Sequence, residues 1–385
     1  MSKVIKSISS KLNFFSYSSR MNNWQFSFLP FVAGLNYFWV LFFDVPLKIQ
    51  TLFITLLFVC SSIGFASLGF FINELFDIES DERGGKRNRL KNITFNQKCL
   101  FLVITFFIIF LPWVYLPSDS WTWILLIAEI ILFLAYSMPY VRLKNNPLIA
   151  ILVDSLYAYV IPTLLSYHTF ALFSKQPHSV IISIFLLALL LTGLRNIIIH
   201  QVEDIEFDRK AEMVTFPLVF GLKASQESLN YLLFFEFISV GSSLFFFSIE
   251  ENLIFYIFIF YCFQILFFGW NFIRNYKKSL NTADYFFPNY FLHINLSLIS
   301  LCLLFQKNNL WLIVLILHFL FLVSNQAKIN ILHSIYKLIL DVLKGFKSII
   351  GFVVNRLIYC GFLLFGIDLI KENKSALEFL RKKYK

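Results

Sequence analysis

The sequence predicts an all-α fold, a polytopic bundle of membrane-spanning helices. Of its 385 residues, 58% are hydrophobic and only 15% are charged. The apolar residues come in runs of about 20, the length that a helix needs to cross a bilayer, rather than in amphipathic stripes. Ten runs of this kind are expected to span the membrane: 26–44, 51–75, 98–116, 120–139, 147–168, 179–200, 225–248, 252–272, 288–306 and 308–326.

Residues 1–25 precede the first span and are expected to form a basic cytoplasmic segment. They contain Lys3, Lys6, Lys11 and Arg20 but no acidic residue. No apolar stretch with a small-residue cleavage site follows, so a cleaved signal is not expected. A basic anchor that lies on the membrane surface is the favoured interpretation.

The second span ends in an acidic motif, Asn73-Glu-Leu-Phe-Asp77-Ile-Glu-Ser-Asp81. Carboxylates are costly near lipid and are rarely placed there without a function. A step of four residues would put Asn73, Asp77 and Asp81 on one helix face, where their oxygen atoms could share a hard cation. A single motif of this kind is also common as a solvated helix end. The basic loop that follows, roughly 76–97, can bend at Gly84 and Gly85.

Spans 5 and 6 each contain a charged residue at a depth where charge is expensive. We expect Asp154 and Arg195 to form a structural ion pair, with Tyr157 and Tyr159 as the other available partners.

The sixth span ends in a second acidic motif, Asp204-Ile-Glu-Phe-Asp208, at the start of a loop that covers roughly 204–224. Asn196 and His200 continue the same four-residue step backwards into the span. Two polar faces in corresponding positions, four spans apart, suggest an internal pseudo-repeat with a site between its halves.

Residues 307–326 are expected to form an additional transmembrane helix, and residues 327–385 a basic amphipathic or re-entrant extension. Within that extension 349–370 is apolar and long enough to cross. Asn355 and Arg356 lie near its middle, however, and basic residues follow it.

The basic residues of the short loops predict the orientation of the bundle. With the N-terminus inside, fourteen Lys and Arg residues fall on the inner side and three on the outer side, a clear positive-inside bias. Both acidic motifs then face the cytoplasm, at the inner membrane if the protein is bacterial. Nucleic acid is not an expected partner, because these residues are scattered among membrane loops. The inner set is Arg83, Lys86, Arg87, Arg89, Lys91, Lys98, Arg142, Lys144, Arg209, Lys210, Lys223, Arg274, Lys277 and Lys278; the outer set is Lys48, Lys175 and Lys307.

The two motifs together indicate a paired-metal clamp for a diphosphate. Mg²⁺ prefers oxygen ligands and is usually held by one or two carboxylates together with substrate phosphates. The candidate metal ligands are Asp77, Asp81, Asp204 and Asp208, assisted by Asn73. The candidate diphosphate ligands are Arg83, Lys86, Arg87, Arg142 and Lys144. His200 could act as a general base towards an acceptor, or support the second motif. Topology alone could also explain the basic residues.

These motifs resemble those of the UbiA superfamily of intramembrane prenyltransferases. That family has an asparagine-led acidic motif after its second helix and a DxxxD motif after its sixth, as found here at Asn73–Asp81 and Asp204–Asp208. The segment Tyr136-Ser-Met-Pro139, followed by Arg142-Leu-Lys144, is similar to the family's segment after its fourth helix. The resemblance covers roughly residues 20–306.

The resemblance implies a membrane domain at 26–306, with nine core transmembrane helices around a central cavity. It also implies that Mg²⁺ binds a prenyl diphosphate through both motifs and that a lipophilic acceptor, expected to be aromatic, attacks the allylic carbon. The sequence departs from the family at Glu74, where Asp is usual, and at Lys86-Arg-Asn-Arg-Leu90, which replaces the usual Arg-Thr and Arg-Pro steps.

Two other functions are compatible with the sequence. A membrane terpene cyclase or a phosphoribosyl-type lipid transferase would use the same diphosphate chemistry. A cation-coupled carrier could bind its cation through the acidic residues, although carrier sites usually lie near the bilayer midplane rather than at its rim.

Overall fold

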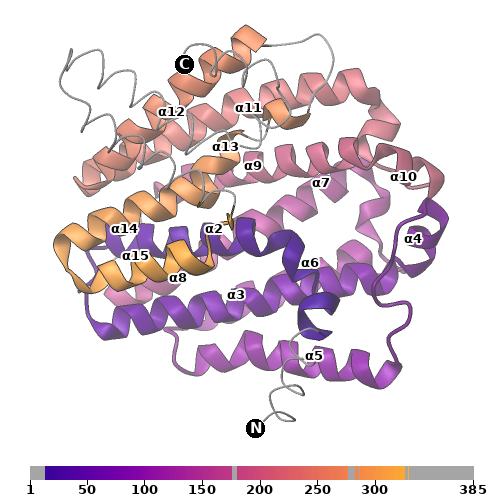
Figure 1. Ribbon diagram of the computed structural model, residues 1–385, viewed down its shortest axis with the longest axis horizontal. Helices are drawn as coiled ribbons and strands as arrows, with labels where there is room; N and C mark the ends of the chain where they lie inside the picture. The colour runs from indigo at the N-terminus through magenta and orange to yellow at the C-terminus, as the bar shows by residue number, and fades with distance from the viewer. Residues whose placement is uncertain (1–13, 176–179, 276–281, 286, 326–327, 329–385) are drawn as a thin grey trace, which may run out of the picture.

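The protein is a bundle of long helices whose axes lie roughly parallel to one another, with successive spans running in opposite directions (Figure 1). The computed structural model describes residues 14–175, 180–275, 282–285, 287–325 and 328, and these residues contain no strand. The predicted extension 327–385, with the segment 349–370, therefore lies outside the described residues except for Lys328, as does the first half of the predicted segment 1–25.

The long helices share an apolar sequence and form the body of the bundle, whereas three short helices lie at its connections. The long helices are α2 (Met21–Phe42), α3 (Ile49–Phe76), α5 (Phe95–Phe110), α6 (Ser120–Ser137), α7 (Pro147–Ser155), α8 (Ile161–Ser174), α9 (Ile182–Glu203), α11 (Phe216–Glu250), α12 (Ile254–Asn275), α14 (Leu296–Lys307) and α15 (Leu310–Phe321). The short helices are α4 (Ile78–Gly84), α10 (Ile205–Lys210) and α13 (Phe287–Tyr290). A π-helical turn, Leu156–Val160, joins α7 and α8 into one span.

Helix α2 lies inside the bundle and packs against α3, α8 and α14. The rings of Phe38 and Trp39 on α2 contact Phe185 on α9 and Phe247 on α11, mostly edge to face. Such aromatic pairs add about 0.5–1.5 kcal/mol each to the burial of their surface. This ring cluster holds the last turns of α2 and α11 against the first turn of α9, at the opposite end of these helices from the start of α2.

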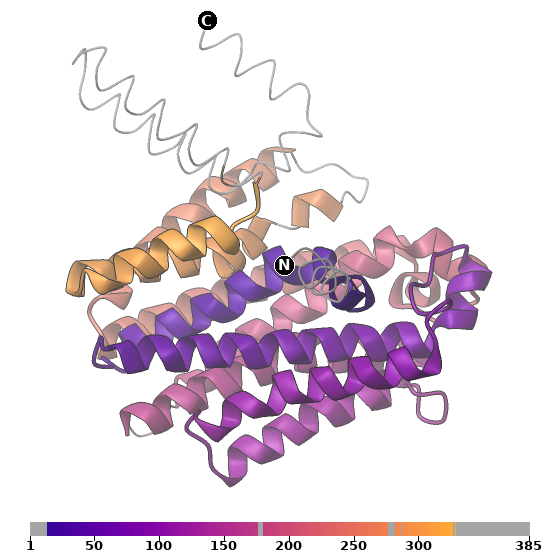
Figure 2. The ribbon, with the colours of Figure 1, turned by 60° about the horizontal axis from the view of Figure 1, so that its bottom comes forward.

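The outer helices expose apolar side chains that a bilayer would cover. Helices α3 and α5 lie side by side (Figure 2). Helix α5 also carries the exposed apolar residues Val103, Phe106 and Phe107. Helices α6 and α11 do the same. Eight described helices are long and apolar enough to span a membrane, so the chain is an integral, multi-pass membrane protein.

The predicted spans agree in place with the helices but differ in length. The span expected at 252–272 coincides with α12, Ile254–Asn275, and the span expected at 308–326 with the shorter helix α15, Leu310–Phe321. Helix α11 begins at Phe216, so the predicted loop 204–224 is largely helical, with a break at Gly221, whose φ of 85° is left-handed. Pro217 and Gly221 interrupt this stretch, and in a sequence such residues indicate a loop.

The predicted pairing of Asp154 with Arg195 is wrong. Arg195 is fully buried on α9 and forms a two-pronged ion pair with Glu236 on α11, with N–O distances of 2.6 and 3.0 Å. Asp154 instead accepts a hydrogen bond from the hydroxyl group of Tyr157, the alternative partner that the sequence offered. The rotation of each helix about its own axis decides which residues its charged side chain meets, and hydropathy does not report that rotation.

Candidate active site

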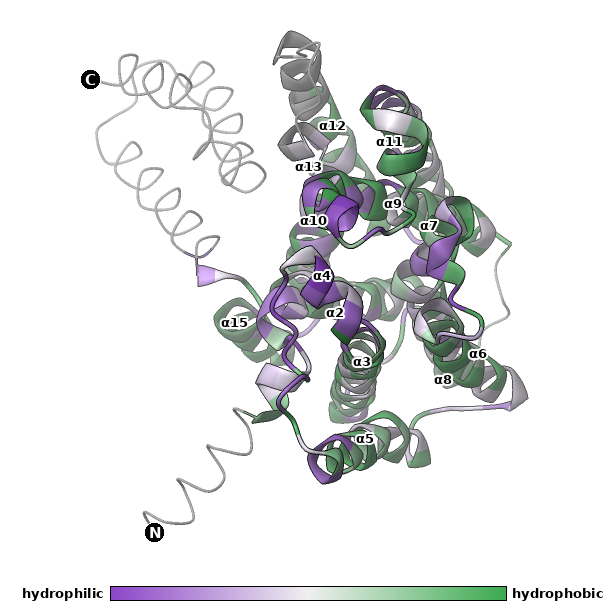
Figure 3. Cartoon of the chain, turned by 90° about the vertical axis from the view of Figure 1, so that its right-hand side faces the viewer, coloured by the Kyte–Doolittle hydropathy of each residue, from purple (hydrophilic) through white to green (hydrophobic). Residues whose placement is uncertain are grey.

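Both acidic motifs lie at the same end of the bundle, where α4 and α10 pack against each other (Figure 3). This end, which we call the motif end, is hydrophilic, while the helices behind it are apolar. The two motifs are thus brought together as predicted, although more than a hundred residues separate them in the chain.

Neither motif lies on one continuous helix, contrary to the sequence prediction. Helix α3 stops before Asp77 and helix α9 stops before Asp204, and each of these residues has a non-helical ψ, 8° and 2° respectively. The second aspartate of each motif belongs to the short helix that follows. The N–H of Asp81 still donates to the Asp77 carbonyl (2.8 Å), and that of Asp208 to the Asp204 carbonyl (2.9 Å). The four-residue step therefore survives across a bend.

The chain after each motif is held by the same kind of contact. The Glu74 carboxylate accepts from the N–H of Arg89 at 3.3 Å, and the Gln201 side-chain oxygen accepts from the N–H of Phe216 at 3.0 Å. The corresponding positions, which include Asp77 with Asp204 and Asp81 with Asp208, are all 127 apart. This agreement supports the predicted pseudo-repeat at the level of the motif backbone.

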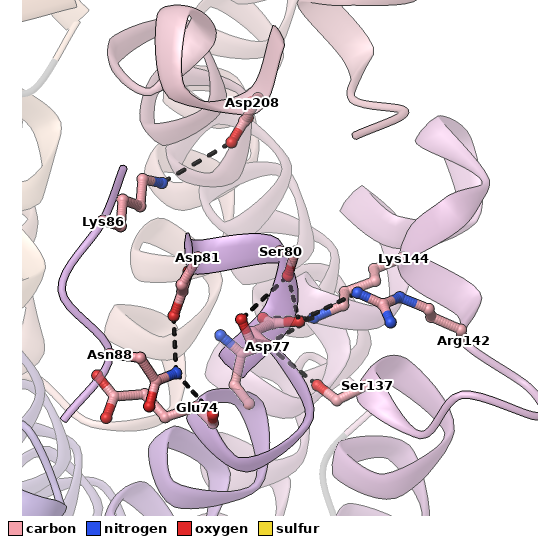
Figure 4. Close-up of polar contacts among 11 residues, drawn as sticks. Glu74, Asp77, Ser80, Asp81, Lys86, Asn88, Ser137, Arg142, Lys144 and Asp208 are labelled. Carbon is pink, nitrogen blue, oxygen red and sulfur yellow. Dashed lines mark hydrogen bonds and ion pairs between the residues drawn. The ribbon is translucent and has the colours of Figure 1, made fainter. Parts of the chain in front are cut away.

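The first aspartate of motif one is surrounded by cations (Figure 4). Lys144 donates to both Asp77 oxygens, at 2.6 Å to Oδ2, and Arg142 donates to Oδ1 at 3.2 Å. The Lys144 ammonium also reaches the Asn73 side-chain oxygen (3.2 Å), to which the Ser137 hydroxyl donates at 3.1 Å. Burial lowers the pKa of Lys144, and ionised Asp77 opposes that change.

The second aspartate of motif one is held by an amide. The Asn88 side-chain amide donates to Asp81 Oδ2 and to the Glu74 carbonyl, both at 2.8 Å. Burial raises the pKa of Asp81, Asn88 opposes the rise and nearby Asp77 adds to it. Asn88 thus ties the loop after α4 to the end of α3 and orients the Asp81 carboxylate.

Lys86 links the first loop to the second motif. Its ammonium lies 2.7 Å from Asp204 Oδ2 and 3.8 Å from Asp208 Oδ1. Burial raises the pKa of Asp208 to about 6, Lys86 opposes this effect and Asp204 adds to it. One lysine therefore stands between the two carboxylates of the second motif.

Three of the predicted site residues lie farther from these contacts. Arg83 faces Glu212 across exposed surface at 3.9 Å, and exposed Arg87 lines a hollow with Arg20 and Asn22 instead of contacting a motif carboxylate. The His200 side chain is 65% exposed and lies 3.8 Å from Glu203, one turn before Asp204. His200 also occupies the position in the second motif that Asn73 occupies in the first.

The donor set suits Mg²⁺ in its chemistry. Four carboxylates and one amide oxygen are hard donors of the kind that this ion prefers. The part of the chain that the structure describes contains no ready cluster of three or more acidic, His or Cys side chains. An ammonium group instead neutralises each motif, Lys144 at Asp77 and Lys86 at Asp204. A metal bound to these carboxylates would release both lysines towards the anion that it carries.

A sequence model of the UbiA prenyltransferase family matches residues 27–295. The chain belongs to this family. The match confirms the resemblance seen in the motifs, and the chain is accordingly a membrane prenyltransferase. A search of curated proteins finds no match to the sequence.

Solved UbiA structures share the fold. A UbiA homologue from Archaeoglobus fulgidus bound to GPP and Mg²⁺ is 17% identical, with a TM-score of 0.53 over 75% of this chain and 98% of that chain. The apo structure of a UbiA homologue from Aeropyrum pernix K1 is 13% identical, with a TM-score of 0.51 over 72% and 97%. A structure of digeranylgeranylglyceryl phosphate synthase in membranes is 18% identical, with a TM-score of 0.50 over 76% and 97%.

The structure adds two positioning residues to this UbiA-family site that the sequence reasoning had not assigned. Asn88 holds Asp81, and Ser137 holds Asn73. Both lie within segments that the sequence had marked, Lys86–Leu90 and Tyr136–Pro139. Their roles depend on contacts between distant segments, and no local pattern reports such contacts.

The pKa of Asp208 leads to a prediction about pH. A carboxyl group must lose its proton to bind a metal, so Mg²⁺ affinity should rise as the pH passes upward through about 6. Below that pKa the apparent affinity should fall by about tenfold per pH unit. Titration of the purified protein with Mg²⁺ at several pH values would measure this, and Asp208→Asn should flatten the dependence. Equal affinity on both sides of the pKa would contradict the prediction.

Proposed function

We propose that the protein transfers an isoprenoid group from a prenyl diphosphate to a lipophilic, aromatic acceptor inside the membrane, and that it requires Mg²⁺. The observation that carries the proposal is the meeting of two acidic motifs with Lys86, Lys144 and Arg142 at one end of an apolar bundle. This arrangement combines metal ligands and anion donors beside a medium that dissolves the isoprenoid chain. The A. fulgidus homologue bound to GPP and Mg²⁺ supports the same donor class.

In this proposal Asp77, Asp81, Asp204 and Asp208 hold Mg²⁺, and Asn73 assists. The ion would neutralise the charge that develops on the diphosphate as the allylic C–O bond breaks. Lys86, Lys144 and Arg142 donate to diphosphate oxygens once the metal has taken their carboxylate partners. Arg83 and Arg87 were predicted for the same role, but neither contacts a motif aspartate among the described residues, so the first three carry the proposal.

We assign His200 the role of accepting a proton from the acceptor. It lies one helical turn before Asp204 and near Glu203, so it can reach a molecule held at the second motif. A His200→Gln variant should lose acceptor prenylation while it still binds the donor. Unchanged prenylation would remove His200 from the mechanism and leave the metal site untouched.

We also place the motif end and the N-terminus in the cytoplasm. The placement is supported by the excess of Lys and Arg in the loops at this end. A cysteine introduced at exposed Lys223 should then react only with a membrane-permeant reagent in intact cells. Labelling by an impermeant reagent would reverse the orientation.

Diphosphate release tests the reaction. Protein in lipid bilayers would be assayed with geranyl, farnesyl and geranylgeranyl diphosphate, with and without Mg²⁺, and with a panel of phenolic acceptors. Release that needs Mg²⁺ and rises with one acceptor supports the proposal. Release without any acceptor would indicate cyclase or hydrolase chemistry instead, and cation uptake without turnover would indicate a carrier.

A further inference from the structure

The loop after α4 contains two kinds of residue, those that contact the acidic motifs and those that do not. Lys86 and Asn88 turn towards the acidic motifs, where they contact Asp204 and Asp81. Arg87 and Arg89 instead line a separate surface beside the start of α2. One short segment thus contacts the metal clamp through Lys86 and Asn88 and leaves the Arg87 and Arg89 side chains without a motif carboxylate.

That surface contains two adjoining hollows of about 450 Å³ each. Tyr17, Arg87 and Arg89 line both of them. The first is completed by Ser16, Arg20 and Asn22 from the segment before α2 and its first turn. The second is completed by Glu82, Lys86, Asn88, Lys91, Asn92 and Ile93, so it adjoins the metal clamp at Lys86 and Asn88. Each hollow has the volume of a small polar headgroup, and together they form a basic groove between α2 and α5.

The cations of the groove are only partly neutralised. Arg20 lies 3.4 Å from the buried carboxylate of Glu74. Arg89 donates to the Tyr17 carbonyl at 3.3 Å and lies over the Tyr17 ring, both of which leave its charge in place. Arg87 is exposed and has no ion pair or hydrogen bond among the described residues.

The other charged side chains of the groove form ion pairs. Lys91 pairs with Glu82 at the far end of the groove. Of the five cations of the groove, Arg20 is thus paired with Glu74, Lys86 with Asp204 and Lys91 with Glu82. Arg87 and Arg89 are left to attract an anion.

The position of the groove indicates where that anion comes from. The groove lies where α2 and α5 begin, at the rim of the membrane-spanning bundle. Exposed Phe26 lies one helical turn after Asn22 on α2, and exposed Phe95 lies two residues after Ile93, so each is close in the chain to a residue that lines the groove. The Tyr17 side chain is 40% exposed within the groove. Apolar side chains beside an aromatic ring and arginines are typical of the depth at which headgroups meet acyl chains.

We propose that this groove binds the phosphate of an anionic phospholipid headgroup. Arg87 and Arg89 contact the phosphate, and Tyr17 and Phe95 contact the adjoining acyl chain. Arg89 also ties the loop to the segment before α2, so the bound lipid would hold the loop that presents Lys86 and Asn88 to the metal clamp. The groove adjoins the diphosphate site, because Lys86 and Asn88 belong to both. Its arginines Arg87 and Arg89 contact none of the motif aspartates among the described residues.

Lipid retention by the full-length purified protein tests this without reference to activity. The protein would be loaded with phosphatidylglycerol or phosphatidylcholine, and the bound lipid counted by native mass spectrometry. The wild type should retain phosphatidylglycerol in preference. Arg87→Ala should weaken its retention by about fivefold, the effect of one basic residue at an anionic surface, and Arg87→Glu by more. Arg87 makes no structural contact, so both variants should fold.

Lys223→Glu provides a matched control, because it reverses one exposed charge at the same end of the bundle but outside the groove. Equal loss of lipid in this variant would reduce the effect to general surface charge and overturn the site. Displacement of the lipid by millimolar inorganic phosphate would show that free phosphate, not a lipid, is the ligand. A raised KM for the prenyl diphosphate in Arg87→Glu, with lipid retention unchanged, would return Arg87 to the donor site.

Discussion

Replacing Asp77 or Asp204 by alanine is expected to lower the rate of diphosphate release by about a hundredfold to a thousandfold, the usual cost of removing one group that stabilises developing charge. Each residue is the first carboxylate of its motif and stands at the bend between two helices. Each also directly contacts a lysine that we place at the diphosphate, Lys144 for Asp77 and Lys86 for Asp204. Loss of either should therefore disturb both the metal and its anion.

Glu79 and Glu206 provide matched controls for this experiment. Both are exposed acidic residues on the same short helices, and they correspond to each other in the pseudo-repeat. Glu79→Ala and Glu206→Ala should release diphosphate at nearly the wild-type rate. If these variants lose as much activity as the aspartate variants, surface charge rather than metal ligation explains the effect.

The Asp77 variant requires a check on folding. Alanine would leave the Lys144 ammonium, which is only 6% exposed, without its main partner, and an unpaired buried charge destabilises a protein. Asp77→Asn retains the shape and a hydrogen-bonding oxygen but loses the charge. It should show the same loss of rate with a smaller loss of stability. Normal turnover by well-folded Asp77→Asn would exclude Asp77 as a metal ligand.

The sequence was sufficient to predict the class of fold and the meeting of the two acidic motifs at one end of the bundle. Apolar runs of membrane-spanning length report helices directly, because no other element of that length satisfies its own backbone in lipid. The two motifs were recognisable because carboxylates are unusual at the ends of such runs. Asp77, Lys144, Lys86 and Asp204 accordingly meet at one end of the bundle.

The sequence could not predict where the helices bend or which way they face. The four-residue spacing of polar residues continues without a break through Asp77 and Asp204. The sequence pattern therefore gives no sign that the helix bends at these two residues. The sequence also does not report how each helix is rotated about its own axis, because spans rich in Phe, Leu and Ile are apolar on every face. The sequence could therefore place Arg195 in span 6, but it could not predict the ion pair of Arg195 with Glu236.

That buried pair leads to the second large prediction, which concerns stability. Arg195→Leu should lower the free energy of unfolding by about 3–5 kcal/mol, because it leaves the Glu236 carboxylate buried without its cation. The loss has further sources, since the Arg195 guanidinium also donates to the Tyr285 carbonyl at 2.6 Å and to the Asn289 side chain at 2.7 Å. Helices α9, α11 and α13 thus converge on one side chain.

The double variant Arg195→Leu/Glu236→Leu separates these sources. It removes the charge together with its partner, so it should recover the part of the loss that comes from an unpaired carboxylate. The loss that remains should reflect the contacts to Tyr285 and Asn289. Unfolding in detergent, followed by tryptophan fluorescence, would compare the three proteins. A double variant no more stable than Arg195→Leu would show that α9 depends on these neutral contacts and that the charge of Glu236 costs nothing in this bundle.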